Sequence, residues 1–379
     1  MVLESNLFGV LNYKPRKPKL YSGYIMNKDD KVARIDNNQV TEILISKLCP
    51  FYLLRTKDFE GWVISRTIDS HRPNSRILRK MLRLKNPESL EVAMRSRCRT
   101  ITDSFWFKEG NDDLTFEDLV FKDDLLKDVA LHGRFDSLEI NQDVFTPELT
   151  NIGSYEKSWV LDSQSNWWLR KIANDKELFS EIFTSMLSNH LGYDAVPYYR
   201  VGDSNVIECE NFVKDGYWFE PMFSILGDEE DYEYNYSVLS NITGVGDLLV
   251  MDYLKILFVD ALVQNPDRHT NNYGVLVRDG NIIKMAPNFD NNLALIAKGF
   301  PRTMPTIKNP LIRDFVDLVN SKNLYFKVPE LSEEDLRMLG YACVMSNRIN
   351  SISRTNVDSI ARFVYNNYKI IKENLEGYK

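Results

Sequence analysis

The chain has 379 residues, of which 44% are hydrophobic and 27% are charged, and its formal net charge is −7. This composition is typical of a soluble globular protein with two or three domains, and the acidic balance disfavours direct nucleic-acid binding. Cys49, Cys98, Cys209 and Cys343 form no C-x-x-C pair, which argues against a zinc site or a disulfide framework. Residues 1–13 lack a signal layout, and the longest apolar run, 248–263, carries three charges. We therefore expect a cytoplasmic protein without a membrane span.

Residues 1–135 are expected to form an N-terminal accessory module. Within it, residues 23–26 are predicted to form a strand and residues 39–48 a helix. Residues 75–85 follow a helical pattern with one apolar face. The opposite face is basic and carries Arg76, Arg79, Lys80 and Arg83. This face is either a solvated helix surface or a docking surface for an acidic partner or RNA, and the sequence leaves both readings open.

A small lobe is expected over residues 140–222. It begins with a loop that contains Gly153, Ser154 and Lys157 and that precedes a predicted hairpin, 159–161 and 167–172. Gly153 permits close approach of the backbone to a phosphate, while Ser154 and Lys157 add hydrogen bonds and charge. The loop has no G-x-G-x-x-G pattern, so by itself it does not define a nucleotide site.

The second strand of this hairpin ends in two adjacent cations, Arg170 and Lys171. Side chains alternate between the two faces of a strand, so only one of them can point inward. Lys171 shares its face with Trp167 and Leu169, and we predict that it is the phosphate-binding lysine. The alternative is a pair of solvated cations on an edge strand.

A helix is predicted over residues 175–191, with Gly192 as its stop. Glu181 lies beside the apolar stripe of this helix. A carboxylate in this position can pair with Lys171 and hold it on the α- and β-phosphates. The alternative is an ordinary glutamate at the edge of the stripe. Strands are expected at 196–201 and 205–212, followed by a crossing at 218–222 into a helical large lobe, 223–379.

The segment that carries most of the predicted chemistry is 265–274, which reads N-P-D-R-H-T-N-N-Y-G. It follows the apolar run 248–263, a predicted core helix, and precedes an apolar strand, 275–277. Phosphoryl transfer from a nucleotide needs a carboxylate near the acceptor hydroxyl and an oxygen ligand for Mg²⁺ close by. We predict that Asp267 is the catalytic base and that Asn272 is a metal ligand.

A hairpin is predicted directly after this loop, because Asp279-Gly280 separates two apolar runs, 275–277 and 282–285. A hairpin returns the chain to its starting point, so Asn272 and Asp290 should lie close together. We predict Asp290 as the second metal ligand. The alternative is that Asn, Pro and Asp serve only as turn residues.

Two other residues of the loop have open roles. His269 is predicted either to contact the nucleotide or to hold Asp267 in place through a loop hydrogen bond. Arg268 is predicted to tie the loop to neighbouring carboxylates.

The pattern N-x-D-R-H-x-x-N-x-G, followed by A-P-x-x-D at 286–290, resembles the bacterial HipA-like kinases. Phosphatidylinositol-type lipid kinases share a related D-R-H-x-x-N loop. The resemblance implies a two-lobed α+β fold, protein-kinase-like or PI3K-like, with bound ATP and Mg²⁺. It also implies that Glu220 and Met222 lie in the crossing against which adenine stacks.

The phosphate loop of the HipA-like kinases reads S/T-x-x-G-x-x-x-K, which residues 150–157 match. In that family a serine of this loop can be autophosphorylated, which switches the enzyme off. Thr150 stands at the matching position, and Ser154 is nearby.

The resemblance implies a serine/threonine protein kinase of toxin type that has a protein substrate and an antitoxin or other regulatory protein as partner. Two alternatives remain open. One is a kinase that acts on a lipid or a small molecule, for which only the basic stretch 298–308 suggests a membrane-facing surface. The other is a pseudokinase that binds nucleotide or a partner without catalysis.

Overall fold

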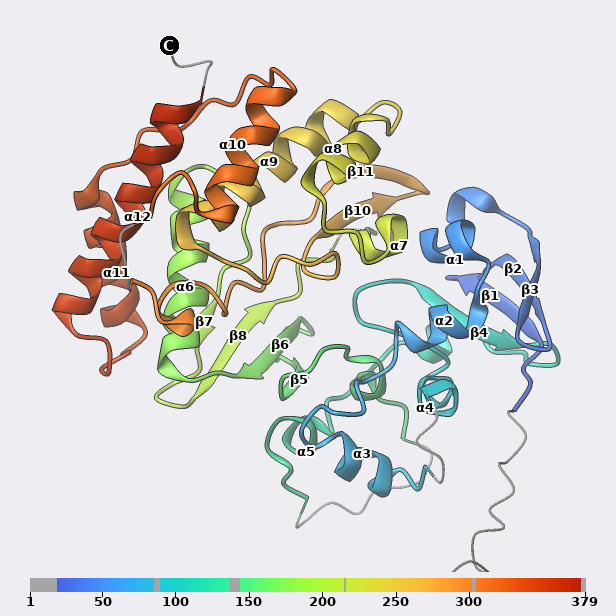
Figure 1. The fold of residues 1–379 in the computed structure, drawn as a ribbon. Coiled ribbons are helices and arrows are strands. Elements are labelled where there is room, and N and C mark those ends of the chain that lie inside the picture. Colours follow the sequence, from blue (N-terminus) through green and yellow to red (C-terminus); the bar gives the residue numbers. More distant parts are fainter. Residues whose placement is uncertain (1–18, 85–88, 136–143, 215, 302–304, 376–379) are drawn as a thin grey trace, which may run out of the picture.

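The computed structural model describes residues 19–84, 89–135, 144–214, 216–301 and 305–375, and it contains three antiparallel sheets surrounded by helices (Figure 1). The strand orders are β3-β2-β1-β4, β5-β6-β8-β7 and β11-β10-β9. An isolated parallel bridge between Ala195 and Asn288 joins the segment after α6 to the segment after β11. The basic stretch 298–308 is described except for residues 302–304.

The N-terminal sheet is built from three strands joined by two hairpins and a fourth strand from much later in the module. Its strands are β1 (Gly23–Asn27), β2 (Asp30–Asp36), β3 (Gln39–Ile43) and β4 (Phe105–Glu109). The helices of this region are α1 (Phe51–Thr56), α2 (Phe59–Ile64), α3 (Ser75–Met81), α4 (Ser89–Arg95) and α5 (Lys127–His132). The predicted strand at 23–26 is confirmed. The helix predicted from residue 75 is also confirmed, although it ends at Met81.

The prediction of a helix over residues 39–48 is wrong, because this segment forms β3 and a short 3₁₀ turn, Ser46–Leu48. Asn37 and Asn38 both have positive φ, 50° and 63°, and this geometry turns β2 back into β3. The Asn38 side chain accepts a hydrogen bond from the Tyr21 N–H at 2.6 Å and donates to Glu60 at 2.8 Å. The turn chemistry therefore outweighed the helical spacing of the apolar residues.

The second sheet and a long helix follow the loop that ends at Lys157. A 3₁₀ turn, Pro147–Thr150, precedes β5 (Lys157–Leu161) and β6 (Trp167–Ile172). Then come α6 (Asp175–His190), β7 (Tyr199–Arg200) and β8 (Val206–Glu210). Asn174 and Glu177 form a capping box at the start of α6. The predicted hairpin and helix are confirmed, whereas the strand predicted at 196–201 is reduced to two residues.

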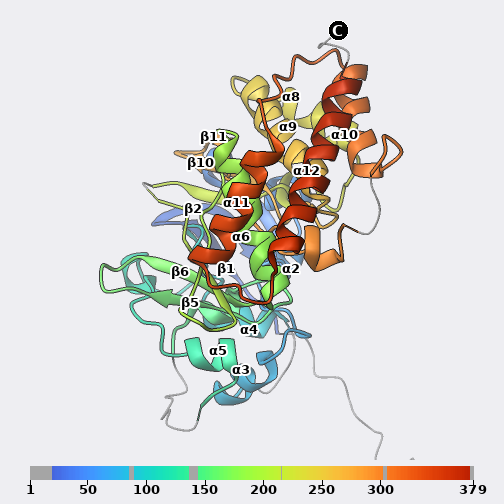
Figure 2. The same cartoon turned by 90° about the vertical axis from the view of Figure 1, so that its left-hand side faces the viewer.

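The remaining chain contains the third sheet and most of the helices. Its elements are β9 (Trp218–Pro221), α7 (Met222–Leu226), α8 (Tyr232–Ser240), α9 (Gly246–Val263), β10 (Gly274–Arg278), β11 (Asn281–Met285), α10 (Pro310–Ser321), α11 (Glu333–Ser346) and α12 (Arg354–Asn374). Helices α6, α11 and α12 lie side by side along one edge of the molecule (Figure 2). Among the described residues, no helix combines the length and the apolar character that a bilayer crossing requires.

One apolar core extends through the N-terminal sheet and the helices of the large lobe. The same cluster of buried side chains includes residues from both regions: Tyr21, Trp62, Phe107, Trp218, Phe258 and Phe363. The boundary predicted between the accessory module and the small lobe falls at residues 136–139, outside the described residues. The accessory module therefore shares its packing with the rest of the chain.

Helix α9 and the hairpin after it fix the two ends of the 265–273 loop. The helix ends at Gln264, whose φ is +54°, and β10 begins at Gly274. Strand β9 passes so close to Gly274 that a Cβ there would collide with the Glu220 carbonyl oxygen. Asp279 and Gly280, with φ of 50° and 75°, turn β10 into β11 as predicted. The crossing predicted at 218–222 is thus an edge strand of this third sheet followed by the start of α7.

Candidate active site

The loop after α9 is anchored by a buried ion pair. Asp260, in the last turn of α9, is fully buried and accepts hydrogen bonds from Arg268 Nε at 2.9 Å and Nη2 at 3.0 Å. The Asn265 side chain adds a third donor to Asp260 at 3.0 Å. A bidentate pair of this kind fixes the direction of the guanidinium as well as its position.

The same guanidinium reaches the segment after β11. Its Nη1 donates to the carbonyl oxygens of Asn272 at 2.6 Å and Phe289 at 2.8 Å. Its Nη2 donates to the side chains of Asn288 at 2.9 Å and Asn291 at 2.6 Å. Burial alone would lower the pKa of Arg268, but the Asp260 carboxylate raises it, so the group stays charged. The prediction that Arg268 ties the loop to a carboxylate is confirmed, and Arg268 also ties it to residues 288–291.

Replacing Arg268 by Lys should destabilise the protein by about 3–5 kcal/mol, because one ammonium cannot replace donors directed at five neighbouring groups. Urea unfolding of the variant measures this loss. Arg313→Lys is the matched control, since Arg313 pairs with Asp314 at a side-chain exposure of 52% and 43%. Equal midpoints for the two variants would contradict the central role of Arg268.

Asp267 and Asn272 lie together, with their polar groups in complementary orientations. The Asn272 amide nitrogen donates to the Asp267 carbonyl oxygen at 2.9 Å, which leaves the amide oxygen as the free acceptor. Among the described residues, no donor forms a hydrogen bond to the Asp267 carboxylate or to the Asn272 amide oxygen. Both oxygens are therefore available to an acceptor hydroxyl or a cation.

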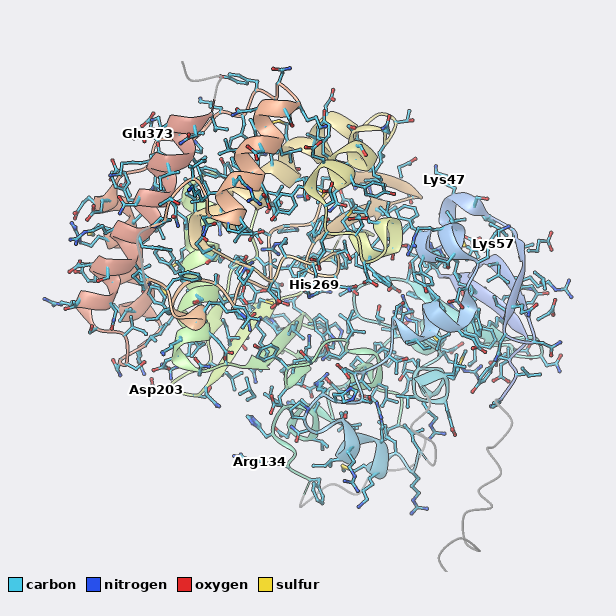
Figure 3. The ribbon with its side chains drawn as sticks, viewed as in Figure 1. Lys47, Lys57, Arg134, Asp203, His269 and Glu373 are labelled. Carbon is cyan, nitrogen blue, oxygen red and sulfur yellow. The ribbon has the colours of Figure 1, made fainter. Side chains whose placement is uncertain are left out.

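The environment of Asp267 disfavours its charged form. Burial raises the pKa of this carboxyl, and the nearby Asp290 carboxylate raises it further, while His269 and Lys298 act in the opposite direction. The His269 backbone N–H donates to the Asp267 carbonyl oxygen at 3.0 Å, and its Nδ1 accepts from the Asn271 N–H at 3.3 Å. Figure 3 places His269 near the centre of the molecule. Its backbone therefore holds the loop, while contact with a nucleotide stays a prediction.

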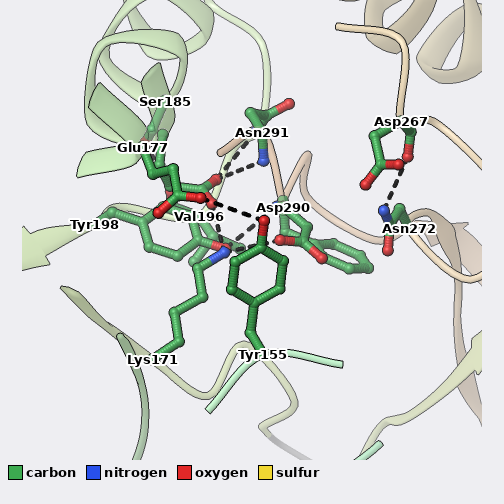
Figure 4. Close-up of polar contacts among 12 residues, drawn as sticks. Tyr155, Lys171, Glu177, Ser185, Val196, Tyr198, Asp267, Asn272, Asp290 and Asn291 are labelled. Carbon is green, nitrogen blue, oxygen red and sulfur yellow. Dashed lines mark hydrogen bonds and ion pairs between the residues drawn. The ribbon is translucent and has the colours of Figure 1, made fainter. Parts of the chain in front are cut away.

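Lys171 lies between two carboxylates (Figure 4). Its ammonium is 2.6 Å from Glu181 Oε2 and 2.7 Å from Asp290 Oδ1. The other Glu181 oxygen accepts the Asn291 N–H at 2.7 Å. As predicted from the alternation of side chains along the strand, Lys171 and Arg170 point to opposite faces. Lys171 points toward α6 and Asp290, whereas Arg170 pairs with Glu208 on the other face.

These contacts keep Lys171 and Asp290 ionised. Burial would lower the pKa of Lys171, but Asp290 and Glu181 hold it well above its ordinary value. Burial would raise the pKa of Asp290, but Lys171 and Lys157 bring it down to about 2. Asp290 is therefore a carboxylate throughout the physiological pH range and has one oxygen left for a cation.

The predicted metal ligands fit a Mg²⁺ ion that is also bound by the phosphates of a substrate. The described residues contain no cluster of three His, Cys, Asp or Glu side chains that could hold a metal ion by itself. Mg²⁺ is usually bound by one or two protein oxygens together with phosphates of the substrate. Asn272 and Asp290 provide two such oxygens, and in Figure 4 Asp290 lies between Lys171 and the Asp267–Asn272 pair.

The loop before β5 places a second cation beside this cluster. Gly153 has φ of +106°, and a side chain there would collide with the Lys157 ammonium. Burial lowers the pKa of Lys157 to about 8, with Arg72 and Lys171 acting in the same direction and Asp290 opposing them. No described residue forms a hydrogen bond or an ion pair with this ammonium. An unpaired cation of this kind favours the approach of an anion.

The two predicted autophosphorylation positions differ in access. Ser154 is exposed in the loop. Thr150 is buried, and its hydroxyl donates to the carbonyl oxygens of Arg99 and of Pro147, the latter at 3.2 Å. Phosphate transfer to Thr150 would therefore require the loop to leave this position, whereas Ser154 already faces solvent.

Glu220 and Met222 lie beside the 265–273 loop, because β9 pairs with β10 and α7 follows β9 directly. The buried Glu220 carboxylate accepts the Phe51 N–H at 3.2 Å, and burial raises its pKa to about 7. The Met222 N–H donates to the Tyr273 carbonyl oxygen at 3.0 Å, and the Met222 side chain is fully buried. The Glu220 carboxylate and the Met222 N–H are thus used inside the fold, and contact of this crossing with adenine stays a prediction.

Several residues that shape the site were not identified from the sequence. Asp260 is one, and its signal was a carboxylate in the last turn of the predicted core helix. Asn288 and Asn291 are two others, and their signal was the asparagine-rich run around Asp290. Tyr198, whose hydroxyl accepts the Asp290 N–H at 3.3 Å, left no signal in the sequence.

No model of a known protein family matches the sequence, and no curated protein matches it. Among solved structures, the chain is similar to HipA of Shewanella oneidensis MR-1, from a toxin–antitoxin complex with HipB and operator DNA. The TM-score is 0.50 at 10% identity, over 84% of this chain and 87% of that chain. The Helicobacter pylori proinflammatory kinase CtkA gives a TM-score of 0.36 at 15% identity, over 59% of this chain and 92% of that chain. The predicted α+β architecture is confirmed, and the chain has a fold of the HipA-like kinase type.

Proposed function

We propose that this protein is an ATP- and Mg²⁺-dependent phosphotransferase that acts on a serine or threonine hydroxyl of a protein. The observation that carries the proposal is the Lys171 ammonium held between Glu181 and Asp290, beside an unengaged Asp267 carboxylate. This set contains a cation for the phosphates, a carboxylate for the metal and a base for the acceptor. The fold shared with HipA supports the same assignment.

Binding of the nucleotide phosphates depends on nearby cations and on the backbone of the loop that contains Gly153. Lys171 and the unpaired Lys157 would hold the phosphates, and the missing side chain at Gly153 makes room for the Lys157 ammonium. Asn272 and Asp290 would hold Mg²⁺, which neutralises charge on the phosphates when it is bound. Glu181 keeps Lys171 in place, since its second oxygen is fixed by the Asn291 N–H at 2.7 Å.

The chemical step requires Asp267 to orient the acceptor hydroxyl and to take its proton. Its carboxylate accepts no hydrogen bond from the described residues, so a hydroxyl can approach it. Burial raises its pKa, which makes it a better proton acceptor than a solvated aspartate. The Asn272 amide and the His269 N–H hold the Asp267 carbonyl, so the base stays in place during transfer.

A protein regulator is the partner that we propose, because the similar HipA structure is a complex with HipB and DNA. A role of toxin type would follow from the same resemblance. Phosphate transfer to the chain itself is a second expected reaction, with Ser154 more accessible than Thr150.

The direct test is incubation of the purified chain with Mg²⁺ and ATP, followed by mapping of phosphosites by mass spectrometry. We expect phosphate on Ser154 or Thr150, or on a protein in added cell extract, and none with Asp267→Asn. If only a lipid or a small molecule is phosphorylated, the acceptor is that molecule and not a protein. ATP binding without any transfer would indicate a pseudokinase.

A further inference from the structure

The base of the phosphate loop is held by a buried arginine of the accessory region. Arg72 lies in the segment between α2 and α3, and its side chain is completely buried. Its guanidinium donates to the Asn151 carbonyl oxygen at 2.9 Å and to the Lys157 carbonyl oxygen. These two carbonyls stand at the beginning and at the end of the loop, so one side chain joins both ends.

The Glu148 carboxylate also contacts both ends of the loop. Glu148 is buried, and its Oε2 is 3.9 Å from Arg72 and accepts the Asn151 amide at 3.2 Å. Its Oε1 accepts the Trp159 N–H of β5 at 2.7 Å. Glu148 therefore links the residues before the loop to the strand after it, beside the same arginine.

Other contacts from the accessory region reach the same place. The Ile68 N–H donates to the Leu149 carbonyl oxygen at 2.9 Å, and the Ser96 hydroxyl donates to the Thr146 carbonyl oxygen at 2.7 Å. The Thr150 hydroxyl donates to the Arg99 carbonyl oxygen. In Figure 1, α5 lies next to β5 and α3 lies next to α5, in agreement with this packing.

We propose that Arg72 is a positioning residue that sets the shape of the phosphate loop and thereby the affinity for the nucleotide phosphates. It touches no candidate catalytic group. It acts through the Asn151 and Lys157 carbonyls, which fix where Gly153 and the Lys157 side chain lie. The accessory region is therefore a structural part of the nucleotide site, and a partner that shifts the 65–74 segment would change ATP binding. This inference rests on the proposed function for its effect on ATP.

Arg72→Lys in the full chain tests the inference, because it keeps the charge but cannot join both carbonyls. Arg66→Lys is the matched control: Arg66 is also buried in this region, but it donates to the Cys98 carbonyl at 2.9 Å and to Asp103 at 2.7 Å. We expect Arg72→Lys to raise the KM for ATP by about tenfold or more, with the KM for the protein acceptor unchanged. Arg66→Lys should leave both KM values at those of the wild type. Its melting temperature should be similar to that of Arg72→Lys.

Hydrogen exchange of the loop amides separates failure of this inference from failure of the proposed function. Exchange over residues 151–157 should be about tenfold faster in Arg72→Lys and unchanged in Arg66→Lys, whether or not ATP is a substrate. Glu148→Gln, which keeps an acceptor for Trp159, should shift exchange in the same direction by less. Identical loop exchange in Arg72→Lys and wild type would overturn the inference. A wild-type chain without ATP binding or transfer would overturn only the proposed function.

Discussion

Replacing Asp267 by Asn is expected to slow phosphate transfer by about 10²–10⁴-fold and to leave ATP binding nearly unchanged. The amide has almost the shape of the carboxylate but cannot accept a proton at neutral pH. The contacts that hold this residue use its carbonyl oxygen, which accepts from Asn272 and His269, so the loop should keep its structure. The loss should therefore appear in kcat and not in the KM for ATP.

Single-turnover kinetics with labelled ATP, together with direct measurement of ATP affinity, check this expectation. Asp279→Asn is a suitable control, because Asp279 is exposed at the tip of the neighbouring hairpin with φ of 50°, a conformation that Asn adopts readily. Equal rates for the two variants would remove Asp267 from the mechanism.

The pH dependence supplies a second readout of the same residue. Burial raises the pKa of Asp267, and the base must be ionised to act, so activity should fall as pH drops through this raised value. The acid limb should therefore lie above the ordinary range of an aspartate. The fold disfavours the ionised form, so Asp267→Asn should be at least as stable as the wild type at pH 7.

Replacing Lys171 by Met is expected to abolish most activity and to destabilise the chain. Removing a cation that stabilises charge in the transition state costs about 10²–10³-fold in rate. Glu181, which has no exposed surface, would also lose its partner, and breaking a buried pair costs about 3–5 kcal/mol. An unpaired buried carboxylate has a raised pKa, so this loss of stability should grow with pH above about 4.3, the value of an unfolded glutamate.

Denaturant unfolding at two pH values and a double variant separate the two effects. Glu181→Gln in the Lys171→Met background keeps an acceptor for the Asn291 N–H and removes the unpaired charge, so stability should return in part while activity does not. The control is Arg170→Met, because Arg170 pairs with Glu208 at side-chain exposures of 31% and 22% and should contribute at most about 1 kcal/mol. Equal costs for Lys171→Met and Arg170→Met would show that Lys171 is not the buried centre of the cluster.

Local spacing was enough to predict that the 265–274 loop and the segment after β11 meet, as the contacts of Arg268 with the carbonyl oxygens of Asn272 and Phe289 show. The Asp279-Gly280 turn fixes a short hairpin, and a short hairpin returns the chain close to its start. Strand parity was enough to choose Lys171 over Arg170, because a β-strand alternates its side chains regardless of the rest of the fold. The helix that carries Glu181 also depends only on nearby residues, since its capping box and its apolar stripe both lie within the segment.

The sequence by itself therefore predicted the hairpin after residue 274, the direction of Lys171 and the helix that carries Glu181, because these follow from spacing within about 25 residues or from alternation along one element. The α+β fold type was implied by the resemblance to the HipA-like kinases. Only the tertiary structure decided which distant groups complete the site. Arg268 donates hydrogen bonds to Asn288 and Asn291. Arg72 donates to the carbonyl oxygens of Asn151 and Lys157. Glu220 accepts a hydrogen bond from Phe51, which is 169 residues away in the sequence. Such partners are chosen by the burial of each polar group, because a buried donor or acceptor must be satisfied by whichever segment the core packing places beside it.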